Sequence, residues 1–290
     1  MSDQDLLAEQ FEEKRAHLRA VAYRMLGSLP EAEDAVQEAW LRLNRSDAGG
    51  IDNVAGWLTT VVARVCLDML RSRKSRREDA LDPQQAERLP SSASDPETEL
   101  LLANSVGLAL LVILDTLDPA ERLAFVLHDM FAIPFDDVAA IVGRSSDAAR
   151  QLASRARRRV QGSRTMPDAD LTRQRKVVDA YLAAARSGDF DVLLELLDPN
   201  IVLRADRRAL GTGAPAEIRD AKQIAERAIK GGARAAQPAL VDGAIGVVVA
   251  PRGRLLMVLR FTIADGKIVE MEAIAERDRL RELNLAVLSD

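Results

Sequence analysis

Arginine is concentrated in one short stretch of the chain, and its spacing there suits contact with a polyanion. The segment from Arg144 to Arg164 holds seven arginines and one aspartate, a local balance of +6. Helical spacing gathers one set of polar side chains on about a third of the helix circumference: Arg150, Gln151, Ser154, Arg157 and Arg158. A guanidinium fork pairs bidentately with a guanine edge or a phosphate. The pattern favours nucleic acid, with a solvated basic helix as the alternative.

The residues around Gly143 predict a helix-turn-helix. Residues 134–142 read as a short helix, and Gly143 lies in the turn that follows. Ser145 or Ser146 then caps a second helix, which should end near Gln161. The side of this helix opposite the arginines is apolar: Ala149, Leu152, Ala153, Ala156 and Val160. Because the second helix of this motif enters the major groove, the sequence predicts a DNA-reading helix here.

A second group of basic side chains lies at the end of a helix predicted from Val54 to Lys74. Between Arg64 and Arg77 there are six basic residues and one acidic residue, a balance of +5. This end is either a second nucleic-acid surface or a solvated helix end whose cations complement the helix dipole. Trp57, near the start of the helix, either stacks on an exposed base or packs in the core.

A helix predicted from Ser28 to about Arg45 has two unlike faces. Ser28-Leu29-Pro30-Glu31 reads as a capping box with proline in the first turn. The apolar stripe consists of Ala32, Val36, Ala39, Trp40 and Leu43. The second face gathers Asp34, Gln37, Glu38 and Leu41. It is acidic and holds a single leucine.

Candidate catalytic groups are sparse. Arg260, Glu270 and Glu272 lie on predicted strands, where alternation would aim them at a pocket. Both histidines lie outside this part of the chain: His17 and His128. Strand carboxylates are more often found on the solvated face of a sheet. An enzyme therefore stays an alternative and not the leading interpretation.

Composition limits the class of protein. At 290 residues with 48% hydrophobic residues, the chain should fold into more than one domain. The net charge of −5 argues against uniform affinity for nucleic acid, so the two basic segments matter more than the sum. Cys66 is the single cysteine, which fits a reducing compartment. No signal peptide pattern and no apolar run near roughly 18 residues occurs, so we expect a cytoplasmic protein with no membrane partner.

The order of patterns divides the chain into helical and mixed parts. Residues 78–100 carry seven acidic residues against one basic and three prolines, which predicts an acidic linker. Helical periodicity returns from Leu100 to Leu117, and Asp118-Pro119 predicts a stop followed by a new start. A second boundary at residues 165–168 precedes the mixed part.

An α+β domain is predicted for the last part of the chain. Helices are expected near residues 172–186 and 191–197, before an extended segment at 201–205. Four more strands, separated by turn residues, are expected at 237–241, 244–250, 254–263 and 267–274. Their spacing predicts an antiparallel meander.

Three ordered motifs resemble bacterial extracytoplasmic-function sigma factors of the sigma-70 family. The first is Glu33-Asp34-Ala35-Val36-Gln37-Glu38-Ala39-Trp40. The second runs from Gly56-Trp57-Leu58-Thr59 to Asp68-Met69-Leu70-Arg71-Ser72. The third joins Phe125-Val126-Leu127-His128 to Ala149-Arg150-Gln151-Leu152-Ala153-Ser154-Arg155-Ala156-Arg157. The similarity covers about residues 8–162, and the remainder resembles the SnoaL-like domain of the sigma-I and sigma-J types.

The resemblance implies a multidomain fold with two all-α domains followed by an α+β domain. Sigma region 2, a helical bundle, would span residues 1–77, and the acidic linker residues 78–100. Sigma region 4, with the helix-turn-helix, would span 101–164. A cone-shaped SnoaL-like regulatory domain with an antiparallel curved sheet would span 171–290. No metal or other cofactor is implied.

The resemblance also assigns a partner to each surface. Core RNA polymerase, through its β′ clamp and β subunits, would be bound by Asp34, Gln37, Glu38 and Leu41. The minus-ten promoter element would be opened and read by Trp57, Arg64, Asp68, Arg71, Arg73 and Lys74. The minus-thirty-five element would be read by Arg144, Ser146, Arg150, Gln151, Ser154, Arg157 and Arg158. The acidic linker would thread the polymerase channel between them.

Two stretches depart from the pattern of relatives that carry this C-terminal domain. Those relatives often have Trp-Leu-Pro-Glu-Pro in the linker and Asp-Gly-Gly-Gly-Lys in the added domain. Here the comparable stretches are Glu87-Arg88-Leu89-Pro90-Ser91 and Asp206-Arg207-Arg208-Ala209. Regulatory contacts that depend on those motifs are therefore not expected in this chain.

The leading hypothesis is a sigma factor, not an enzyme, whose C-terminal domain tunes its activity in cis. Whether that domain binds a small ligand stays open. The first alternative is a stand-alone helix-turn-helix regulator, which would bind duplex DNA without polymerase. The second is a cyclase or isomerase of the SnoaL type fused to a DNA-binding module.

Overall fold

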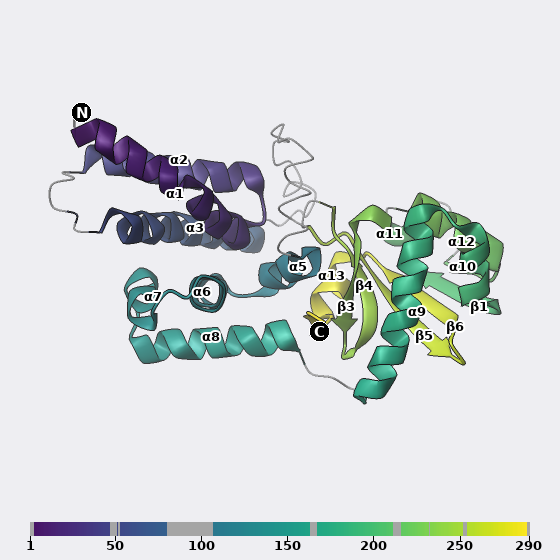
Figure 1. The fold of residues 1–290 in the computed structure, drawn as a ribbon. Helices are drawn as coiled ribbons and strands as arrows, with labels where there is room; N and C mark the ends of the chain where they lie inside the picture. Colours follow the sequence, from purple (N-terminus) through teal and green to yellow (C-terminus); the bar gives the residue numbers. More distant parts are fainter. Residues whose placement is uncertain are drawn as a thin grey trace. The chain divides into compact units, whose positions relative to one another are not determined.

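Two compact units make up the chain (Figure 1). The computed structural model describes residues 3–46, 51, 53–79, 107–162, 167–210, 216–231, 233–251 and 254–288. The first unit comprises Met1–Val106 and Leu114–Arg157, and the second comprises Gly107–Ile113 and Arg158–Asp290. The predicted acidic linker from residue 80 onward and the boundary at residues 165–166 lie outside the described residues.

A bundle of three helices opens the first unit. The helices are α1 (Asp3–Leu26), α2 (Leu29–Arg45) and α3 (Val54–Asp79), and each contacts the other two. Their shared core includes Leu18, Tyr23, Leu43, Leu58 and Leu67. The helix predicted to end at Lys74 continues for five more residues, so the whole basic end of α3 is helical.

The apolar stripe predicted for α2 is confirmed. Ala32, Val36, Ala39 and Leu43 are buried, and the half-buried Trp40 ring lies 4.8 Å from that of Phe11.

The predicted capping box of α2 is wrong. Ser28 takes the N-cap position, but its side chain makes no capping hydrogen bond. The carboxylate of Glu31, which would complete the box, pairs instead with the guanidinium of Arg73 on α3. The Glu31 carboxylate therefore makes a tertiary ion pair in place of a local capping hydrogen bond.

Shorter helices follow in the second half of the helical part. They are α5 (Leu108–Thr116), α6 (Pro119–Ala124), a π-helix η3 (Phe125–Met130), α7 (Phe135–Val142) and α8 (Ser146–Gln161). The predicted stop and new start at Asp118 is confirmed, since its side chain accepts a hydrogen bond of 3.1 Å from the Ala120 amide and caps α6. The π-helix was not predicted.

The second unit is built on one seven-stranded sheet. The strands are β1 (Leu197–Ala205), β2 (Glu217–Ile218), β3 (Ala236–Val241), β4 (Ala244–Val249), β5 (Met257–Ala264), β6 (Lys267–Ile274) and β7 (Leu285–Ala286). Their order across the sheet is β2-β1-β6-β5-β4-β3-β7. Strands β3 to β6 form the predicted antiparallel meander.

Two of the meander turns follow from their residue types. Asp242 and Gly243 have φ of 50° and 82°, and Asp265 and Gly266 have φ of 50° and 77°. Asp-Gly pairs suit turns with two positive φ angles, because aspartate tolerates that region and glycine has no Cβ. The sheet as a whole is mixed, since β1 runs parallel to β6, a pairing that local sequence does not indicate.

Helices cover one face of this sheet (Figure 1). They are α9 (Asp168–Ser187), α10 (Phe190–Leu196) and α12 (Ala221–Lys230), with shorter helices α11 (Arg207–Leu210), α13 (Arg277–Glu282) and the 3₁₀ turn η4 (Ala233–Ala235) around them. The core between helices and sheet includes Val178, Tyr181, Leu193, Phe261 and Met271. Helix α12 was not predicted. No helix within the described residues is both long and apolar enough to cross a bilayer.

Candidate nucleic-acid interface

The arginine side of α8 is exposed and its opposite side is buried, as predicted. Arg150, Gln151 and Arg158 are exposed, whereas Ser154 and Arg157 are half-buried; these five residues are the arginine face of α8. The apolar side is buried: Ala149, Leu152, Ala153, Ala156 and Val160. One side of the helix therefore anchors it while the other presents hydrogen-bond donors to solvent.

The turn between α7 and α8 is set by glycine and serine chemistry. Gly143 ends α7 with φ of 73°, and no atom lies within 4 Å of where a Cβ would stand. Backbone conformation, not crowding, therefore selects glycine here. The Ser145 hydroxyl accepts a hydrogen bond of 3.3 Å from the Ala148 amide at the start of α8. The Ser146 hydroxyl bonds Asp136 in the first turn of α7 and so ties the two helices together.

Carboxylates hold two of the arginines in extended positions. Arg150 pairs with Asp147 at 2.7 Å, and its guanidinium lies 5.5 Å from the centre of the Phe135 ring. Arg157 pairs with Asp129 of the π-helix at 2.5 Å. More than half of the Arg150 side chain stays exposed, at 55%. Such contacts limit the rotamers of the arginines without burying them, so less ordering is needed on binding.

The Phe135 ring that contacts the Arg150 guanidinium is itself part of an aromatic stack. The His128 and Phe135 rings are stacked with centroids 3.7 Å apart, and His128 Nδ1 lies 2.9 Å from the Ile133 carbonyl oxygen. The stack joins the π-helix to α7. Neither the stacking of these two rings nor the carboxylates that pair with the arginines were predicted; only the three-residue spacing of Asp147 and Arg150 indicates a helical ion pair.

The basic end of α3, defined by Arg64, Arg71, Arg73 and Lys74, makes contacts of a different kind. Arg64 donates to the Ala140 carbonyl oxygen of α7 at 3.3 Å. Lys74 pairs with Asp118 at 2.9 Å. Both contacts join parts of the first unit that are far apart in sequence. Two of the predicted minus-ten residues, Arg64 and Lys74, therefore already have partners within the unit.

Arg73 differs from its neighbours on α3. It donates to the Leu26 carbonyl oxygen at 3.1 Å, pairs with Glu31, and has only 18% of its side chain exposed. These contacts favour a structural role for Arg73 over a contact with DNA. Asp68 is 72% exposed and lies 3.9 Å from Arg71, and Trp57 is half-buried in the first turn of the helix.

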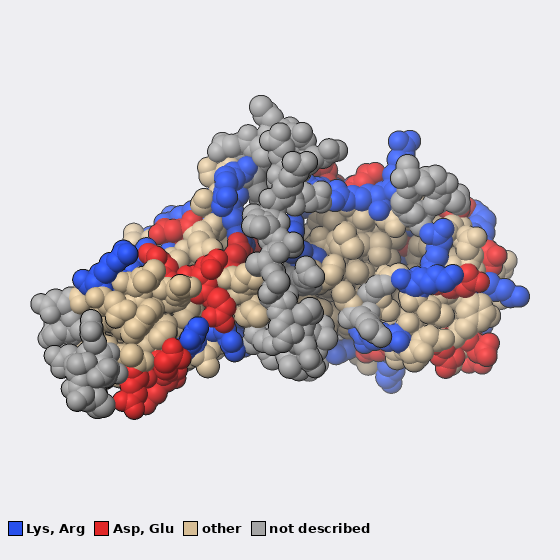
Figure 2. Space-filling view, turned by 90° about the horizontal axis from the view of Figure 1, so that it is seen from above, with Lys and Arg blue, Asp and Glu red and all other residues tan. Residues whose placement is uncertain are grey.

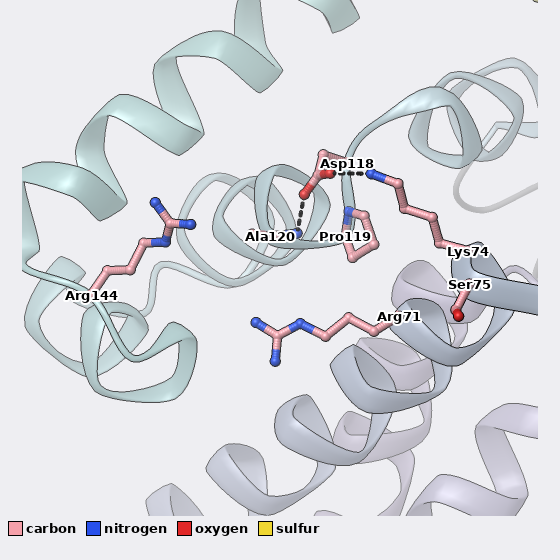
Figure 3. Close-up of a pocket in the computed structure, with 7 residues that line it drawn as sticks. All are labelled: Arg71, Lys74, Ser75, Asp118, Pro119, Ala120 and Arg144. Carbon is pink, nitrogen blue, oxygen red and sulfur yellow. Dashed lines mark hydrogen bonds and ion pairs between the residues drawn. The ribbon is translucent and has the colours of Figure 1, made fainter. Parts of the chain in front are cut away.

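A pocket of about 280 Å³ brings together residues predicted to read different promoter elements (Figure 3). It is lined by Arg71, Lys74, Ser75, Asp118, Pro119, Ala120 and Arg144. In Figure 3 the guanidinium groups of Arg71 and Arg144 extend from opposite sides into the space between them. The remaining residues of the arginine face of α8 do not line this pocket.

The Asp118 carboxylate is held ionised at this pocket. Burial raises its pKa, but hydrogen bonds from Lys74 and the Ala120 amide outweigh burial, and the pKa falls below its ordinary value. Arg144 adds to this effect through its charge. The pocket therefore holds one carboxylate among three cationic side chains.

The second face of α2 is open to solvent. Asp34, Gln37 and Leu41 are exposed, and 40% of the Leu41 surface is accessible. Glu38 pairs with Arg42 at 2.8 Å. Figure 2 shows acidic side chains beside uncharged ones on the end of the molecule that holds α1 and α2. We refer to Asp34, Gln37, Glu38 and Leu41 as the acidic face of α2.

The strand carboxylates of the second unit do not point toward its core. Glu272 lies 3.6 Å from Arg260 and 2.5 Å from Arg279, and Glu270 pairs with Arg204. Their neighbours on β6, Met271 and Ala273, are the residues that enter the core under the helices. The expectation that alternation would aim these carboxylates at an interior pocket is therefore wrong. Alternation instead places them in ion pairs on the other face.

Two segments of the chain match models of known protein families. The family model described as Sigma-70 region 2 matches residues 11–76, and the model described as Sigma-70, region 4 matches residues 107–160. The first segment contains the acidic face of α2 and nearly all of α3. The second contains the helix-turn-helix.

Relatives of the chain include sigma factors of Mycobacterium tuberculosis. The chain is 40% identical over 210 residues to "Probable ECF RNA polymerase sigma factor SigI", covering 72% of each protein. It is 37% identical over 287 residues to "ECF RNA polymerase sigma factor SigJ", covering 93% of this chain and 92% of the relative. The crystal structure of SigJ from that organism is 35% identical and has a TM-score of 0.47, covering 94% of this chain and 98% of that one.

Proposed function

The chain belongs to the extracytoplasmic-function sigma factors of RNA polymerase, in the sigma-70 family, and from that premise we propose which surface holds each partner. The protein acts with core RNA polymerase and promoter DNA in promoter-specific transcription initiation. Members of this family are regulatory proteins rather than enzymes. Because core polymerase works in the cytoplasm, we propose that compartment for this chain.

The acidic face of α2 is the proposed dock for core polymerase. An accessible leucine flanked by Asp34, Gln37 and Glu38 combines an apolar anchor with charges of one sign. Interfaces of this kind draw most of their affinity from a few central anchors, while the surrounding charges steer the encounter. We assign this face to the β′ clamp, and the acidic linker to the polymerase channel beside the β subunit.

The basic end of α3 is the proposed minus-ten surface, with Trp57, Arg64, Asp68, Arg71 and Lys74 as its members. We assign Arg73 to the packing of α3 against α1 and α2, because most of its side chain is buried there. The assignment rests on the charge of the helix end and on the exposure of Arg64, Asp68, Arg71 and Lys74.

The arginine face of α8, with Arg144 and Ser146 at its start, is the proposed minus-thirty-five surface. The observation that carries the whole proposal is the segregation of α8, with five residues of its apolar side buried and Arg150, Gln151 and Arg158 exposed on the other side. Arg150 is the best candidate for a base contact, because Asp147 and Phe135 hold its guanidinium outward.

Binding both promoter elements requires the first unit to open. The elements are about 25 base pairs apart, which is roughly 85 Å along B-form DNA. Yet Arg71, Lys74 and Arg144 line one pocket in this structure. We therefore propose that α3 separates from α6, α7 and α8 when the protein joins polymerase on a promoter.

The second unit is proposed as a regulator in cis of the helix-turn-helix. Its compact unit includes the ends of two helices of that part, residues 108–113 of α5 and residues 158–161 of α8. The Val287 amide donates to the Val160 carbonyl oxygen at 2.8 Å, so the segment after β7 is bonded to the last turn of α8. A change in this domain, including binding of a small ligand, would reach α8 directly.

Substitution of Leu41 tests the polymerase assignment. Leu41→Glu should weaken capture of core polymerase by about tenfold, the scale of one interface anchor, without lowering the melting temperature. The matched control is Leu256→Glu, because Leu256 is an even more exposed leucine, at 50%, in the second unit. Core binding and run-off transcription are measured for both variants.

Two results would count against the proposal. If Leu41→Glu captures core polymerase as the unchanged protein does, the acidic face of α2 is not the dock. If the purified protein shifts promoter duplex tightly by itself and ignores core polymerase, it is a stand-alone regulator.

A further inference from the structure

The pocket between α3 and the α6 start is unusual in its charge. Arg71 and Lys74 enter it from α3, and Arg144 enters it from the turn before α8. Asp118 is the single carboxylate among the lining residues, so the lining carries three positive charges and one negative charge. An excess of two positive charges in one hollow attracts a dianion.

The three cations are not equally engaged. Lys74 pairs with Asp118 at 2.9 Å. Arg71 has only a 3.9 Å approach to Asp68, and 54% of its side chain is exposed. The exposed Arg144 guanidinium makes no hydrogen bond or ion pair with the residues that the structure describes. Figure 3 shows the guanidinium groups of Arg71 and Arg144 extending into the hollow.

We propose that this pocket binds a small phosphorylated anion, of the pyrophosphate or terminal-phosphate type. Guanidinium forks match phosphate oxygens in geometry, and the Ser75 side chain supplies a further polar group at the wall. The volume of about 280 Å³ lies at the lower end of ordinary small-molecule sites, which suits a compact anion. The Asp118 carboxylate orients Lys74 and would be repelled by the anion, so it limits the affinity.

Binding would have a regulatory consequence that rests on the proposed function. The anion would be gripped by Arg71, Lys74 and Arg144 at once, and these are residues assigned above to two separate promoter elements. An occupied pocket would therefore hold the first unit closed and compete with promoter DNA. The binding site itself does not depend on that assignment.

Calorimetric titration of the full-length chain with sodium pyrophosphate, at constant ionic strength, tests the site. One saturable site is expected. Lys74→Gln and Arg144→Gln should each weaken binding by about tenfold, the scale of one charge-assisted contact. Asp118→Asn should strengthen binding, because it removes the repelling charge and keeps a good helix cap. The control is Arg76→Gln, which removes the same charge from the same helix outside the pocket.

The site is refuted if no saturable binding occurs, or if Arg76→Gln weakens binding as much as the pocket variants do. It is also refuted if Asp118→Asn weakens binding. Hydrogen exchange gives a second readout, because pyrophosphate should protect amides near residues 71–75 and 118–120 and leave the second unit unchanged. Protection confined to the second unit, or no protection at residues 71–75 and 118–120, would overturn the assignment.

A short DNA duplex without a promoter distinguishes the other source of phosphate. At duplex concentrations below the dissociation constant for nonspecific DNA binding, the duplex should not displace pyrophosphate. If displacement instead grows in proportion to the phosphate content of the duplex, the pocket is a general DNA contact. Pyrophosphate that binds as expected but does not inhibit promoter use would confirm the site and refute the promoter roles of its residues.

Discussion

The two basic surfaces of the first unit differ in how their cations are engaged. On α8 the arginines pair with carboxylates of the same helix-turn-helix part, such as Asp147 and Asp129, and stay open to solvent. On α3 the cations contact other parts of the unit, through Ala140 and Asp118. The first surface is arranged for binding as it stands. The cations of α3 must first lose their contacts with Ala140 and Asp118, so two surfaces of similar charge differ in how readily they can bind DNA.

Substitution of Arg122, which holds α6 against the bundle beside the α3 surface, should have the largest effect on stability. Arg122 is only 2% exposed, donates to the Arg24 carbonyl oxygen at 3.3 and 3.2 Å, and pairs with Asp115 at 3.3 Å. It therefore holds α6, and with it Asp118, against the bundle. Arg122→Met keeps the volume but leaves a buried carbonyl unpaired, and should cost about 3 kcal/mol of unfolding free energy.

Denaturant unfolding measures the Arg122 effect, with Arg42→Met as the control. Arg42 also pairs with a carboxylate, but 47% of its side chain is exposed, so its loss should cost less than about 0.5 kcal/mol. Equal losses for the two variants would show that the packing of α6 on the bundle contributes little.

Arg150 tests the readiness of the α8 surface. Arg150→Ala should weaken binding of a minus-thirty-five duplex by about 1–3 kcal/mol if the fork contacts a base edge. Arg150→Lys keeps the charge but loses the fork, so it separates base contact from phosphate contact. Fluorescence anisotropy across a salt series reports both. A loss restored fully by lysine would reassign Arg150 to the phosphate backbone.

Asp118 tests whether the α3 surface is held back. Asp118→Asn keeps the cap but releases Lys74, so it should raise affinity for minus-ten DNA about twofold, since an exposed ion pair contributes about 0.5 kcal/mol. An unchanged or lower affinity would show that the Lys74 contact does not restrain α3.

The same ion pair has a pH signature. The pKa of Asp118 is lowered in the folded protein, so its stabilising effect is present above the unfolded pKa of about 3.9 and is lost as the pH falls through the lowered folded value. The stability difference between the unchanged protein and Asp118→Asn should therefore be constant well above the unfolded pKa and shrink as the pH falls below it. Thermal melting from pH 7 down to about pH 2 measures this difference. A difference that does not shrink over this range would assign the effect to the side-chain shape.

Most helices and strands near the proposed sites could be predicted from local patterns. The spacing of apolar residues predicted α2, α3 and α8, and the Asp-Gly turns predicted the meander of β3 to β6. These features depend on neighbours within a few residues along the chain, which is why a single sequence suffices. The parallel pairing of β1 with β6 joins residues about 70 positions apart, and no local pattern specifies it.

The roles of Arg73 and Lys74 show the limit of sequence in this protein. The two residues are adjacent and basic, and both come directly after the second sigma-factor motif, which ends at Ser72. On a helix they point about 100° apart, so Arg73 enters the packing at Leu26 and Glu31 while Lys74 reaches Asp118 at the pocket. The sequence determined the family, the helices and the excess of positive charge. Only the tertiary structure decided which cations stay open for binding, because that depends on where distant carboxylates and carbonyl groups come to lie.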